Sequence, residues 1–516
     1  MIDRAPRLAA VVLGALAALG FQPLGIWPLT LLGTAGLITL IARATNRKQA
    51  ALAGWLFGLG HFAIGLNWIA TAFTYQAQMP AWLGWIAVLG IALVLAAFPA
   101  LAALGAWALA RRQPPALVLA LAGCWIIAEW LRSWVMTGLA WNPLGAAALG
   151  GFSQAGLATL LPWLGTYALS GLVVLLAGSW WLAAQREEPR WRRAVLVIGP
   201  ALLFVLPTGG RGGEGTLVVT LLQPDVRQDV LNDPSQFEAQ FANAARLSLP
   251  RQPGQRRIVL WPESGVPDLL RDGYPAYFYR DSTYGANPRL ARARIGRVAG
   301  QGGLLLTGAV DLEIQRGAAV GARNAVTVVD ENGTIVASYA KAHLVPGGEY
   351  LPLRRLLEPL GAARLVAGSI DFWPGPGPRT LQLGPWGKAG VQICYEIIFS
   401  GQVVDRANRP DYIFNPSNDG WFGSWGPPQH LAQARLRAIE EGLPVLRSTT
   451  TGISAVIDAD GIVRQHVPRL TAGRLDGLIP PAHPPTLFAR LGNVLPLGWA
   501  LLLLGLSQVA TRRRRG

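Results

Sequence analysis

The sequence predicts a membrane protein in which a bundle of about eight transmembrane helices carries one layered α/β domain. Hydrophobic residues make up 51% of the 516 residues and charged residues only 14%, a balance typical of membrane proteins. Long uncharged runs are bordered by short basic runs, as in helices that cross a bilayer. One long segment, residues 216–480, instead alternates short β-prone and helical stretches, which predicts the α/β domain.

Eight stretches of the chain are predicted to span the bilayer. Residues 8–42 predict a hairpin of two short helices with a tight turn at Phe21–Pro28, and a cleaved signal peptide is the alternative for the first helix. Residues 49–110 contain no Asp, Glu, Lys or Arg and are predicted to hold two further spans. The other four are predicted at residues 114–133, 161–184, 194–207 and 491–511.

Basic residues mark one side of this bundle. They gather at the N-terminus, after the second, fourth and sixth spans, and at the C-terminus, while the opposite short loops hold only Arg132. Because basic loops stay in the cytoplasm, both termini are predicted to be cytoplasmic. The residues concerned are Arg4, Arg7, Arg43, Arg47, Lys48, Arg111, Arg112, Arg186, Arg190, Arg192, Arg193 and Arg512 to Arg515.

The same bias divides the chain into three parts. Residues 1–210 are predicted to form a membrane domain with seven spans, and residues 489–516 a C-terminal span with a basic cytoplasmic tail. Residues 211–488 then lie outside the cytoplasm, which in a Gram-negative cell is the periplasm. The sequence therefore predicts one extracytoplasmic α/β domain held between the seventh and eighth spans.

Composition and motifs argue against several other classes of protein. The net charge of +16 is borne largely beside apolar segments, so no nucleic-acid partner is expected. The two cysteines, Cys124 and Cys394, lie in different parts of the chain, so a disulfide is not expected. Without a Cys/His cluster or a Gly-rich phosphate loop, neither a metal nor a cofactor is expected. A transporter is an alternative, although the spans hold few ionisable residues besides His61, Glu129 and Arg132.

The α/β domain is predicted element by element from the spacing of its apolar residues. Asp330-Glu331-Asn332-Gly333 is predicted to be a hairpin turn between two strands. Helices are predicted at Gln236–Ser248, Arg289–Ala299 and Gln429–Glu441. Strands are predicted at Leu217–Leu222, Ile258–Trp261, Gly303–Thr307, Ala325–Val329, Thr334–Tyr339, Ala389–Ile393, Tyr412–Asn415, Val445–Thr449 and Ala455–Ile457.

The stretch Val391–Ile398 has the pattern of a nucleophile at the end of a strand. An apolar, β-prone run stops at Cys394, and Tyr395 and Glu396 follow before the chain turns apolar again. We expect such a thiol to be exposed at a sheet edge, with the next backbone N–H facing a developing oxyanion. A buried structural cysteine is the alternative, and it is the commoner role of an isolated cysteine.

Two further charged residues lie at predicted strand ends. Glu263 follows one apolar strand, and Lys341 follows another, two residues before His343. A desolvated carboxylate can take the proton of a thiol, and an ammonium group can stabilise both the thiolate and an oxyanion. Singly, these residues also fit a surface carboxylate, a solvated turn lysine and a core histidine. Together with Cys394, they predict an acyl-transfer site.

A Glu, a Lys and a Cys-Tyr-Glu, in this order and on alternating α/β elements, resemble the nitrilase superfamily. With the surrounding spans, the whole chain is similar to the apolipoprotein N-acyltransferase family of the bacterial inner membrane. The motifs that carry this resemblance are Trp261-Pro262-Glu263, His343-Leu344-Val345-Pro346 ending at Glu349, Cys394-Tyr395-Glu396, Ser417-Asn418-Asp419-Gly420-Trp421-Phe422-Gly423, Gly54-Trp55-Leu56-Phe57-Gly58-Leu59-Gly60 and Asn67-Trp68.

The resemblance implies a nitrilase-like α-β-β-α sandwich for the α/β domain. It also implies a catalytic triad with Glu263 as general base, Lys341 as stabiliser of the oxyanion and Cys394 as nucleophile. The supporting or substrate-binding positions that it implies are Glu349, Tyr395, Glu396 and Trp421.

The resemblance further implies the reaction and its partners. Cys394 would take an acyl chain from a phospholipid as a thioester, and the α-amine of a diacylglyceryl-cysteine at an apolipoprotein N-terminus would then receive it. The product is a triacylated lipoprotein, made at the inner membrane by a multi-pass enzyme that works by a ping-pong mechanism without a cofactor. A membrane-tethered amidohydrolase, in which water takes the acyl group, is the alternative.

Two departures from the family's pattern concern lipid contacts. Gly347 stands where the family usually has a Phe, and no Trp occurs between Gln223 and Asp233. The segment Leu351–Asp371 mixes aliphatic and arginine residues, which fits an interfacial amphipathic lid or an ordinary surface helix. The contacts to the acyl chains are therefore less well defined by the sequence than the triad.

Overall fold

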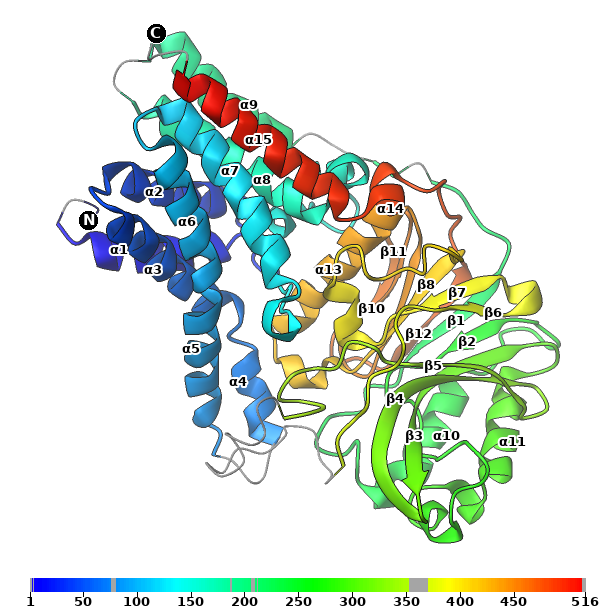
Figure 1. Cartoon of the computed structure of the whole chain (residues 1–516). Coiled ribbons are helices and arrows are strands. Elements are labelled where there is room, and N and C mark those ends of the chain that lie inside the picture. The colour runs from blue at the N-terminus through cyan, green and yellow to red at the C-terminus, as the bar shows by residue number, and fades with distance from the viewer. Residues whose placement is uncertain are drawn as a thin grey trace.

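A computed structural model gives the arrangement of the chain and describes every residue except 1, 3, 76–79, 186–187, 206–208, 211, 352–369 and 513–516. A bundle of helices forms one part, and an α/β domain packs against one end of this bundle (Figure 1). The C-terminal helix, coloured red, returns from the α/β domain and lies against the bundle. Both termini lie on the side of the bundle away from the α/β domain (Figure 1).

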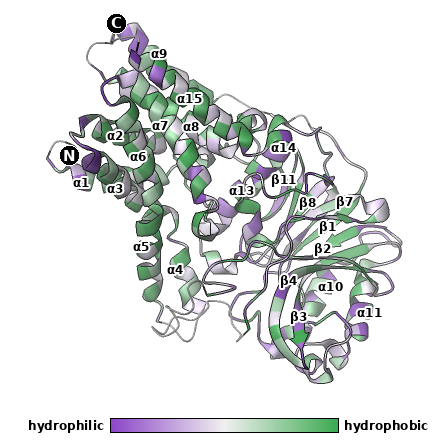
Figure 2. Ribbon diagram, in the orientation of Figure 1, coloured by the Kyte–Doolittle hydropathy of each residue, from purple (hydrophilic) through white to green (hydrophobic). Residues whose placement is uncertain are grey.

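The bundle consists of apolar helices, which are largely green in the hydropathy colouring of Figure 2. Two of them, α1 (Pro6–Ala18) and α2 (Trp27–Arg43), form the hairpin predicted for residues 8–42. The remaining helices of the bundle are α3 (Arg47–Gly65), α4 (Ile69–Ala72), α5 (Leu83–Leu95), α6 (Ala97–Ala110), α7 (Pro114–Arg132), α8 (Leu161–Ala183), α9 (Arg190–Val205) and α15 (Val494–Arg512).

Four of the described helices are long and apolar enough to cross a membrane, or five if the bent pair of α3 and α4 forms one span. They fit a multi-pass membrane protein, but this count does not confirm the eight spans that the sequence predicts. The reason is partly length, because the 13 residues of α1 extend only about 20 Å against a bilayer core of roughly 30 Å. The four are Leu83–Ala110, Pro114–Arg132, Leu157–Ala183 and Val494–Arg512.

The glycines of the sequence motif at residues 54–60 allow α3 to approach two neighbouring helices closely. A Cβ added at Gly54 would lie 2.5 Å from the carbonyl oxygen of Pro99 on α6. A Cβ at Gly60 would lie 2.0 Å from the carbonyl oxygen of Val11 on α1. Helix association in lipid depends on such close packing of small residues. The motif therefore serves the packing of the bundle.

The α/β domain contains two six-stranded sheets that face each other. The first sheet has the order β12-β1-β2-β3-β4-β5 and the second the order β11-β10-β9-β8-β7-β6. The strands are β1 (Val218–Gln223), β2 (Ile258–Leu260), β3 (Leu304–Gln315), β4 (Ala318–Asp330), β5 (Ile335–Ala340), β6 (Thr380–Gln382), β7 (Lys388–Val391), β8 (Tyr412–Ser417), β9 (Val445–Thr449), β10 (Ser454–Ile457), β11 (Val463–Val467) and β12 (Gly473–Leu478).

The two sheets repeat one pattern of strand directions. In the first, β1, β2 and β3 run parallel, and β12, β4 and β5 are antiparallel to their neighbours. In the second, β7, β8 and β9 run parallel, and β6, β10 and β11 are antiparallel to their neighbours. Strands β2 and β8 are therefore the central parallel strands of their sheets. Apolar side chains from both sheets fill the space between them, among them Leu221, Leu260, Leu306, Val391 and Phe414.

Helices cover the outer faces of the sheets and complete the predicted α-β-β-α sandwich. On the first sheet, α10 (Phe237–Leu247) and α11 (Pro288–Ala299) bury an apolar layer. On the second, α13 (Gly426–Glu441) lies between the sheet and the bundle, followed later by the short α14 (Leu487–Leu491) (Figure 1). The three predicted helices and all nine predicted strands are confirmed within a few residues, although β3 and β4 are longer than predicted, and β6, β11 and β12 were not predicted.

Buried charges on α13 fix the α/β domain to the bundle. Glu440 accepts hydrogen bonds from the N–H of Thr166 at 2.6 Å and from its hydroxyl at 2.5 Å, at a break in α8. Arg437 lies 2.7 Å from Glu440, and Arg435 donates to three backbone carbonyls in the loop that precedes α8. Because a buried charge is costly unless it is paired, these contacts favour one fixed arrangement of the two parts.

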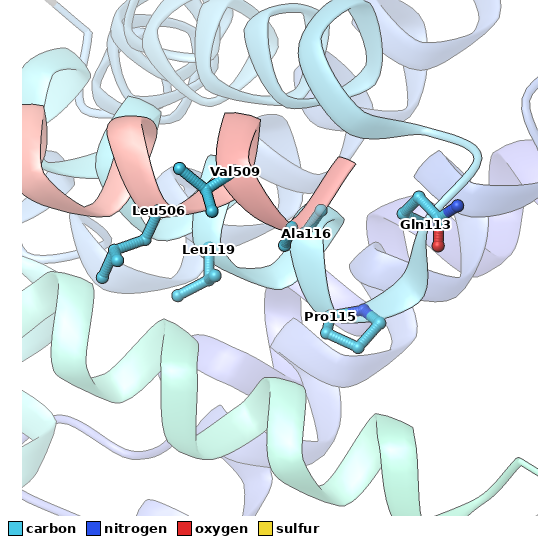
Figure 3. Close-up of a pocket in the computed structure, with 7 residues that line it drawn as sticks. Gln113, Pro115, Ala116, Leu119, Leu506 and Val509 are labelled. Atoms are coloured by element: carbon cyan, nitrogen blue, oxygen red, sulfur yellow. The ribbon is translucent and has the colours of Figure 1, made fainter. Parts of the chain in front are cut away.

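An open apolar cavity of about 420 Å³ lies where the N-terminal end of α7 meets the C-terminal end of α15 (Figure 3). Its lining is almost entirely aliphatic, with Gln113 as its polar residue, and the cavity is formed from helix ends remote in sequence from the triad candidates. It plays no part in the chemistry described below.

Candidate active site

The structure brings together the three residues that the sequence singles out for chemistry. Glu263 lies three residues after β2 and Cys394 three residues after β7, at the carboxyl ends of parallel strands. Lys341 directly follows β5, and its N–H donates to the carbonyl of Asn324 on β4 at 2.8 Å. Both Glu263 and Lys341 interact electrostatically with the Cys394 thiol. The predicted grouping at strand ends is therefore present.

Cys394 is held in an unusual backbone conformation at the start of a short helical turn, Cys394–Ile398. Its φ is +50°, a left-handed value that residues with a Cβ rarely adopt and that is enriched at functional sites. The thiol is not exposed at a sheet edge, as predicted from the sequence, because Cys394 is only 4% exposed and β7 pairs with strands on both sides. A loop of the bundle contacts the neighbouring Tyr395, and this contact could not be read from the strand pattern.

The thiol of Cys394 is kept protonated by its surroundings. Burial raises the pKa of Cys394, and the negative charge of Glu263 raises it further, while Lys341 acts in the opposite direction. Ser417, whose hydroxyl donates to Asp419 Oδ1 at 2.7 Å, also lowers the pKa of Cys394, but burial outweighs it. A buried thiol of this kind needs a base beside it at the moment of attack, since only the thiolate is a strong nucleophile.

Lys341 lies between two carboxylates. Its Nζ is 3.0 Å from Glu349 Oε2 and 3.5 Å from Glu263 Oε1, and its side chain is 1% exposed. Burial lowers the pKa of Lys341, but Glu349 and Glu263 outweigh burial, so the net pKa is raised and the ammonium stays charged. The site therefore holds one fixed positive charge beside the thiol.

Asn324 and Asn418 fix the orientation of the two carboxylates. The Asn324 amide donates to Glu263 Oε1 at 2.7 Å and to Glu349 Oε1 at 2.9 Å. The backbone N–H of Asn418 donates to the other oxygen of Glu263 at 2.7 Å. Glu349 also accepts from the N–H of Val345 at 2.8 Å. Each carboxylate is thus oriented by donors on segments far apart in the sequence.

Glu396 ties the turn of the nucleophile to the segment of the lysine. Its Oε2 accepts from the N–H of Ile393 at 2.8 Å, one residue before Cys394. Its Oε1 accepts from the Tyr339 hydroxyl at 2.8 Å and from two N–H groups just after Lys341, at 2.7 and 3.1 Å. Burial raises the pKa of Glu396 to about 7, against the opposing effect of these donors.

Tyr395 and Trp421 reach the bundle rather than the thiol. The hydroxyl of Tyr395 donates to the carbonyl of Gly138, in the loop between α7 and α8, at 2.9 Å. In the same loop Trp141 is fully buried, and its indole donates to Gln429 on α13 at 2.8 Å. Trp421 packs edge-to-face against Tyr75 of the bundle, with 5.9 Å between ring centroids. The turn that holds Cys394 is therefore in direct contact with the helical bundle.

Gly347, where the family usually has a Phe, has a φ of +76°. Its N–H donates to the carbonyl of Tyr350 at 2.9 Å within a tight turn, and a Cβ added there would meet nothing within 4 Å. The glycine thus permits a left-handed turn that leads Glu349 back to Lys341. The proposed lid, Leu351–Asp371, lies almost wholly outside the described residues.

The sequence interpretation missed several residues that contact the triad or its neighbours. Asn324 could have been noticed as an amide directly before the predicted strand Ala325–Val329. His430 and Arg447 gave no such signal, because their partners lie on segments brought close only by the fold. Among the described residues, no three His, Cys, Asp or Glu side chains form a group suited to hold a metal ion.

Two protein families match the chain. Residues 13–179 match the family described as Apolipoprotein N-acyltransferase N-terminal domain. Residues 219–481, about half of the chain, match the family described as Carbon-nitrogen hydrolase. The two matches coincide with the helical bundle and the α/β domain of the structure.

Curated relatives match along nearly the whole chain. The chain is similar to the apolipoprotein N-acyltransferase of Bradyrhizobium diazoefficiens, with 36% identity over 98% of this chain and 95% of the relative. Similarity is equally broad for the enzymes so named from Rhodopseudomonas palustris, at 35% identity over 98% and 95%, and from Caulobacter vibrioides, at 34% over 98% and 94%. Among solved structures, an amidase from Nesterenkonia sp. is 19% identical over 52% of this chain and 94% of the amidase, with a TM-score of 0.34.

Proposed function

The chain belongs to the apolipoprotein N-acyltransferase family, and from this premise we propose how its own residues transfer an acyl chain to lipoproteins. It is an acyltransferase of the carbon-nitrogen hydrolase superfamily that acts in lipoprotein N-acylation. The donor is a phospholipid, and the acceptor is the α-amine of the diacylglyceryl-cysteine at an apolipoprotein N-terminus. The main support for the proposal is Lys341, which is ion-paired to two carboxylates and lies beside a protonated, strained Cys394.

The first half-reaction loads the enzyme. Glu263 takes the proton of the Cys394 thiol as the sulfur attacks the carbonyl carbon of a phospholipid ester. The negative charge that develops on the carbonyl oxygen is stabilised by the Lys341 ammonium and by the backbone N–H of Tyr395. The ester C–O bond then breaks, Glu263 returns the proton to the departing oxygen, and a lysophospholipid leaves. The acyl chain remains on Cys394 as a thioester.

The second half-reaction unloads the enzyme onto the lipoprotein. The neutral α-amine attacks the thioester carbonyl, and the same two donors stabilise the second oxyanion. The C–S bond breaks, Glu263 takes a proton from the attacking nitrogen and passes it to the sulfur, and an amide is formed. Because the lysophospholipid leaves before the amine enters, the kinetics are ping-pong.

The remaining predicted residues hold this machinery in place. Glu349 keeps Lys341 charged and positioned, and Glu396 orients the turn of the nucleophile, as their hydrogen bonds suggest. Tyr395 joins the turn to the membrane domain, and Trp421 lies where an acyl chain would approach from the bundle. The chemistry requires neither a metal nor a cofactor, because proton transfer and charge stabilisation are supplied by side chains and one backbone N–H.

The proposed topology places the chemistry at the outer face of the inner membrane. Residues 1–210 provide seven spans and residues 489–516 the eighth, with residues 211–488 in the periplasm. The basic loops and the position of both termini away from the α/β domain support this arrangement (Figure 1). A fluorescent protein fused after the C-terminus should fluoresce, and alkaline phosphatase fused there should be inactive. The reverse result would contradict the topology.

The thioester is tested by mass spectrometry of the purified protein after incubation with phospholipid. Wild type should gain the mass of one acyl chain on Cys394, and a diacylglyceryl lipopeptide should then remove it and gain the same mass. The Cys394→Ala variant should gain nothing, while Cys124→Ala, the matched control at the other cysteine, should behave as wild type. An adduct that persists in Cys394→Ala would refute the proposed nucleophile.

Acyl transfer and hydrolysis differ in the molecule that takes the acyl chain from Cys394, a lipopeptide amine or water. Wild type should transfer the chain to the lipopeptide faster than it releases free fatty acid. Release of fatty acid with no acylated lipopeptide would favour the amidohydrolase alternative, which is supported only by the shared fold. The family match over both parts of the chain favours acyl transfer over this hydrolase and over a transporter.

A further inference from the structure

A second polar network contacts the nucleophile through its backbone carbonyl. His430, on α13, is fully buried, and its Nε2 lies 3.0 Å from the backbone carbonyl oxygen of Cys394. Its Nδ1 lies 3.0 Å both from Asp419 Oδ1 and from Arg447 Nη2. Arg447 in turn contacts both oxygens of Asp419, at 2.7 and 2.9 Å. The network is separate from the Glu263–Lys341–Glu349 group.

The partners of His430 determine which ring nitrogen carries the proton. A carbonyl oxygen can only accept, so Nε2 of His430 must donate to Cys394. Burial lowers the pKa of His430, and the positive charge of Arg447 lowers it further, so the ring is neutral at physiological pH. Nδ1 therefore has no proton and accepts from Arg447. The network fixes a single tautomer with its N–H directed at the nucleophile's carbonyl.

The hydrogen bond from His430 to the Cys394 carbonyl also affects the N–H of Tyr395, because the two groups belong to one peptide unit. The peptide bond that joins Cys394 to Tyr395 is trans and planar, so the carbonyl of Cys394 and the N–H of Tyr395 point in opposite directions. A donor that holds the carbonyl therefore also sets the direction of the N–H. A hydrogen bond to the carbonyl also polarises the amide and strengthens the N–H as a donor.

The same network holds the chain on the other side of Cys394. Arg447 donates through Nη1 to Asn415, and the Asn415 amide donates to the carbonyl of Gln392 at 2.6 Å. Gln392 lies two residues before Cys394. The strained left-handed residue is thus held at its own carbonyl and at the carbonyl two residues before it, by side chains of the second sheet and its covering helix.

We propose that His430 is a positioning residue for acyl transfer, which aims the Tyr395 N–H at the developing oxyanion by holding the Cys394 carbonyl. Arg447, which donates to Nδ1, sets the tautomer together with the Cys394 carbonyl, and Asp419 holds Arg447 in place. This inference rests on the proposed function, because it assigns the Tyr395 N–H to the thioester chemistry of Cys394. It also connects that chemistry to the membrane domain, since the Trp141 ring packs 5.2 Å from the ring of His430.

Three variants separate this role from a merely structural one. In His430→Gln the side-chain amide can still reach the position of Nε2 and donate to Cys394. In His430→Asn the amide can reach only the position of Nδ1, so contact with Asp419 and Arg447 is kept but the bond to Cys394 is lost. His483→Asn is the control, because His483 bonds Asp460 at 3.0 Å and has no contact with the triad. All are made with Cys124→Ala, so that Cys394 is the sole cysteine.

Two rates are measured on each purified full-length variant: acylation of Cys394 by phospholipid, and its alkylation by iodoacetamide. Alkylation needs the thiol but no oxyanion donor. In His430→Asn, acylation should fall about 10- to 100-fold, less than the roughly 10²–10³-fold for removing an oxyanion donor, because the N–H is misdirected and not removed. Alkylation should stay within about threefold of wild type. His430→Gln should acylate within about fivefold of wild type, and His483→Asn should change neither rate.

Three results would overturn the inference: acylation by His430→Asn at the wild-type rate, a parallel fall of alkylation and acylation, or equal defects in the Asn and Gln variants. In each case wild type still forms the adduct, so the proposed function stands. If wild type forms no adduct on Cys394, the proposed function itself fails and this inference fails with it.

Discussion

In each of the two sheets of the α/β domain, a carboxylate follows the central parallel strand. The two carboxylates have different surroundings. Glu263 follows β2 and Asp419 follows β8, the central parallel strands of their sheets. Glu263 meets a lysine at 3.5 Å and two amide donors, whereas Asp419 meets both a guanidinium at 2.7 Å and a histidine at 3.0 Å. In the proposed mechanism, the position of Glu263 serves proton transfer and that of Asp419 serves positioning.

Charge explains why the two positions are not interchangeable. Burial raises the pKa of Asp419, but the charge of the Arg447 guanidinium outweighs burial and the pKa lies well below its usual range. A carboxylate held in this way cannot take a proton from a thiol. Glu263 shares Lys341 with Glu349. It therefore has no guanidinium of its own to hold it, as Arg447 holds Asp419. In the proposed mechanism, the first sheet thus supplies the carboxylate that transfers the proton, and the second supplies the residues that hold the nucleophile.

The largest expected effect is the loss of the base in the first sheet. Glu263→Gln should lower the rate of Cys394 acylation by about 10²–10⁴-fold, the usual contribution of a general base. Stability should change little, because Lys341 keeps Glu349 and the glutamine keeps an acceptor for Asn324. Single-turnover mass spectrometry measures the rate, and Glu313→Gln, on a half-exposed ion pair of β3, is the control. Equal rates in wild type and Glu263→Gln would remove the assigned base.

Loss of the carboxylate in the second sheet should act on stability instead. Asp419→Asn leaves the fully buried Arg447 without its anion, which should cost about 3–5 kcal/mol of unfolding free energy. Guanidinium denaturation in detergent, followed by tryptophan fluorescence, measures this loss. Asp458→Asn is the matched control, because its partner Arg464 is 37% exposed, and it should cost only about 1 kcal/mol. Similar losses in both variants would contradict the contrast between the two positions.

The strands and helices that hold Glu263 and Asp419 could be predicted from the sequence, because their apolar residues follow a regular pattern. The three strands that it did not predict, β6, β11 and β12, all lie at sheet edges. Edge strands are short and polar, as the Arg464-Gln465-His466 run of β11 illustrates, so they lack the apolar signal of central strands.

The candidate site was predicted where a residue type and a strand end coincide, as for Glu263, Lys341 and Cys394. It was not predicted where function depends on contacts across the fold. His430 contacts the backbone of a residue 36 positions away, and Gly138, in a loop of the bundle, contacts Tyr395 from 257 positions away. The predicted exposure of the thiol was wrong for the same reason.

The carboxylate of Glu396 joins the two sheets. It accepts from Ile393, which follows β7 of the second sheet. It also accepts from Tyr339 and from the two N–H groups after Lys341, at the end of β5 of the first sheet. Every one of these partners donates, so the ionised form is the one that can accept from all of them. Burial raises the pKa of Glu396 to about 7, so the carboxylate is ionised above this pH and takes up a proton below it. Protonation should loosen the turn of the nucleophile.

The rate of Cys394 acylation should therefore fall about tenfold as the pH is lowered from 8 to 6, the worth of roughly 1.4 kcal/mol. In Glu396→Gln the rate should be low at both pH values and this inflection should be lost. His343→Gln is the control for the neighbouring histidine, whose pKa burial lowers from its ordinary value, and it should keep the inflection. Loss of the inflection in His343→Gln, or its survival in Glu396→Gln, would assign the titration to a group other than Glu396. The hydrogen bonds of Glu396 between the two sheets would then not respond to pH in this range.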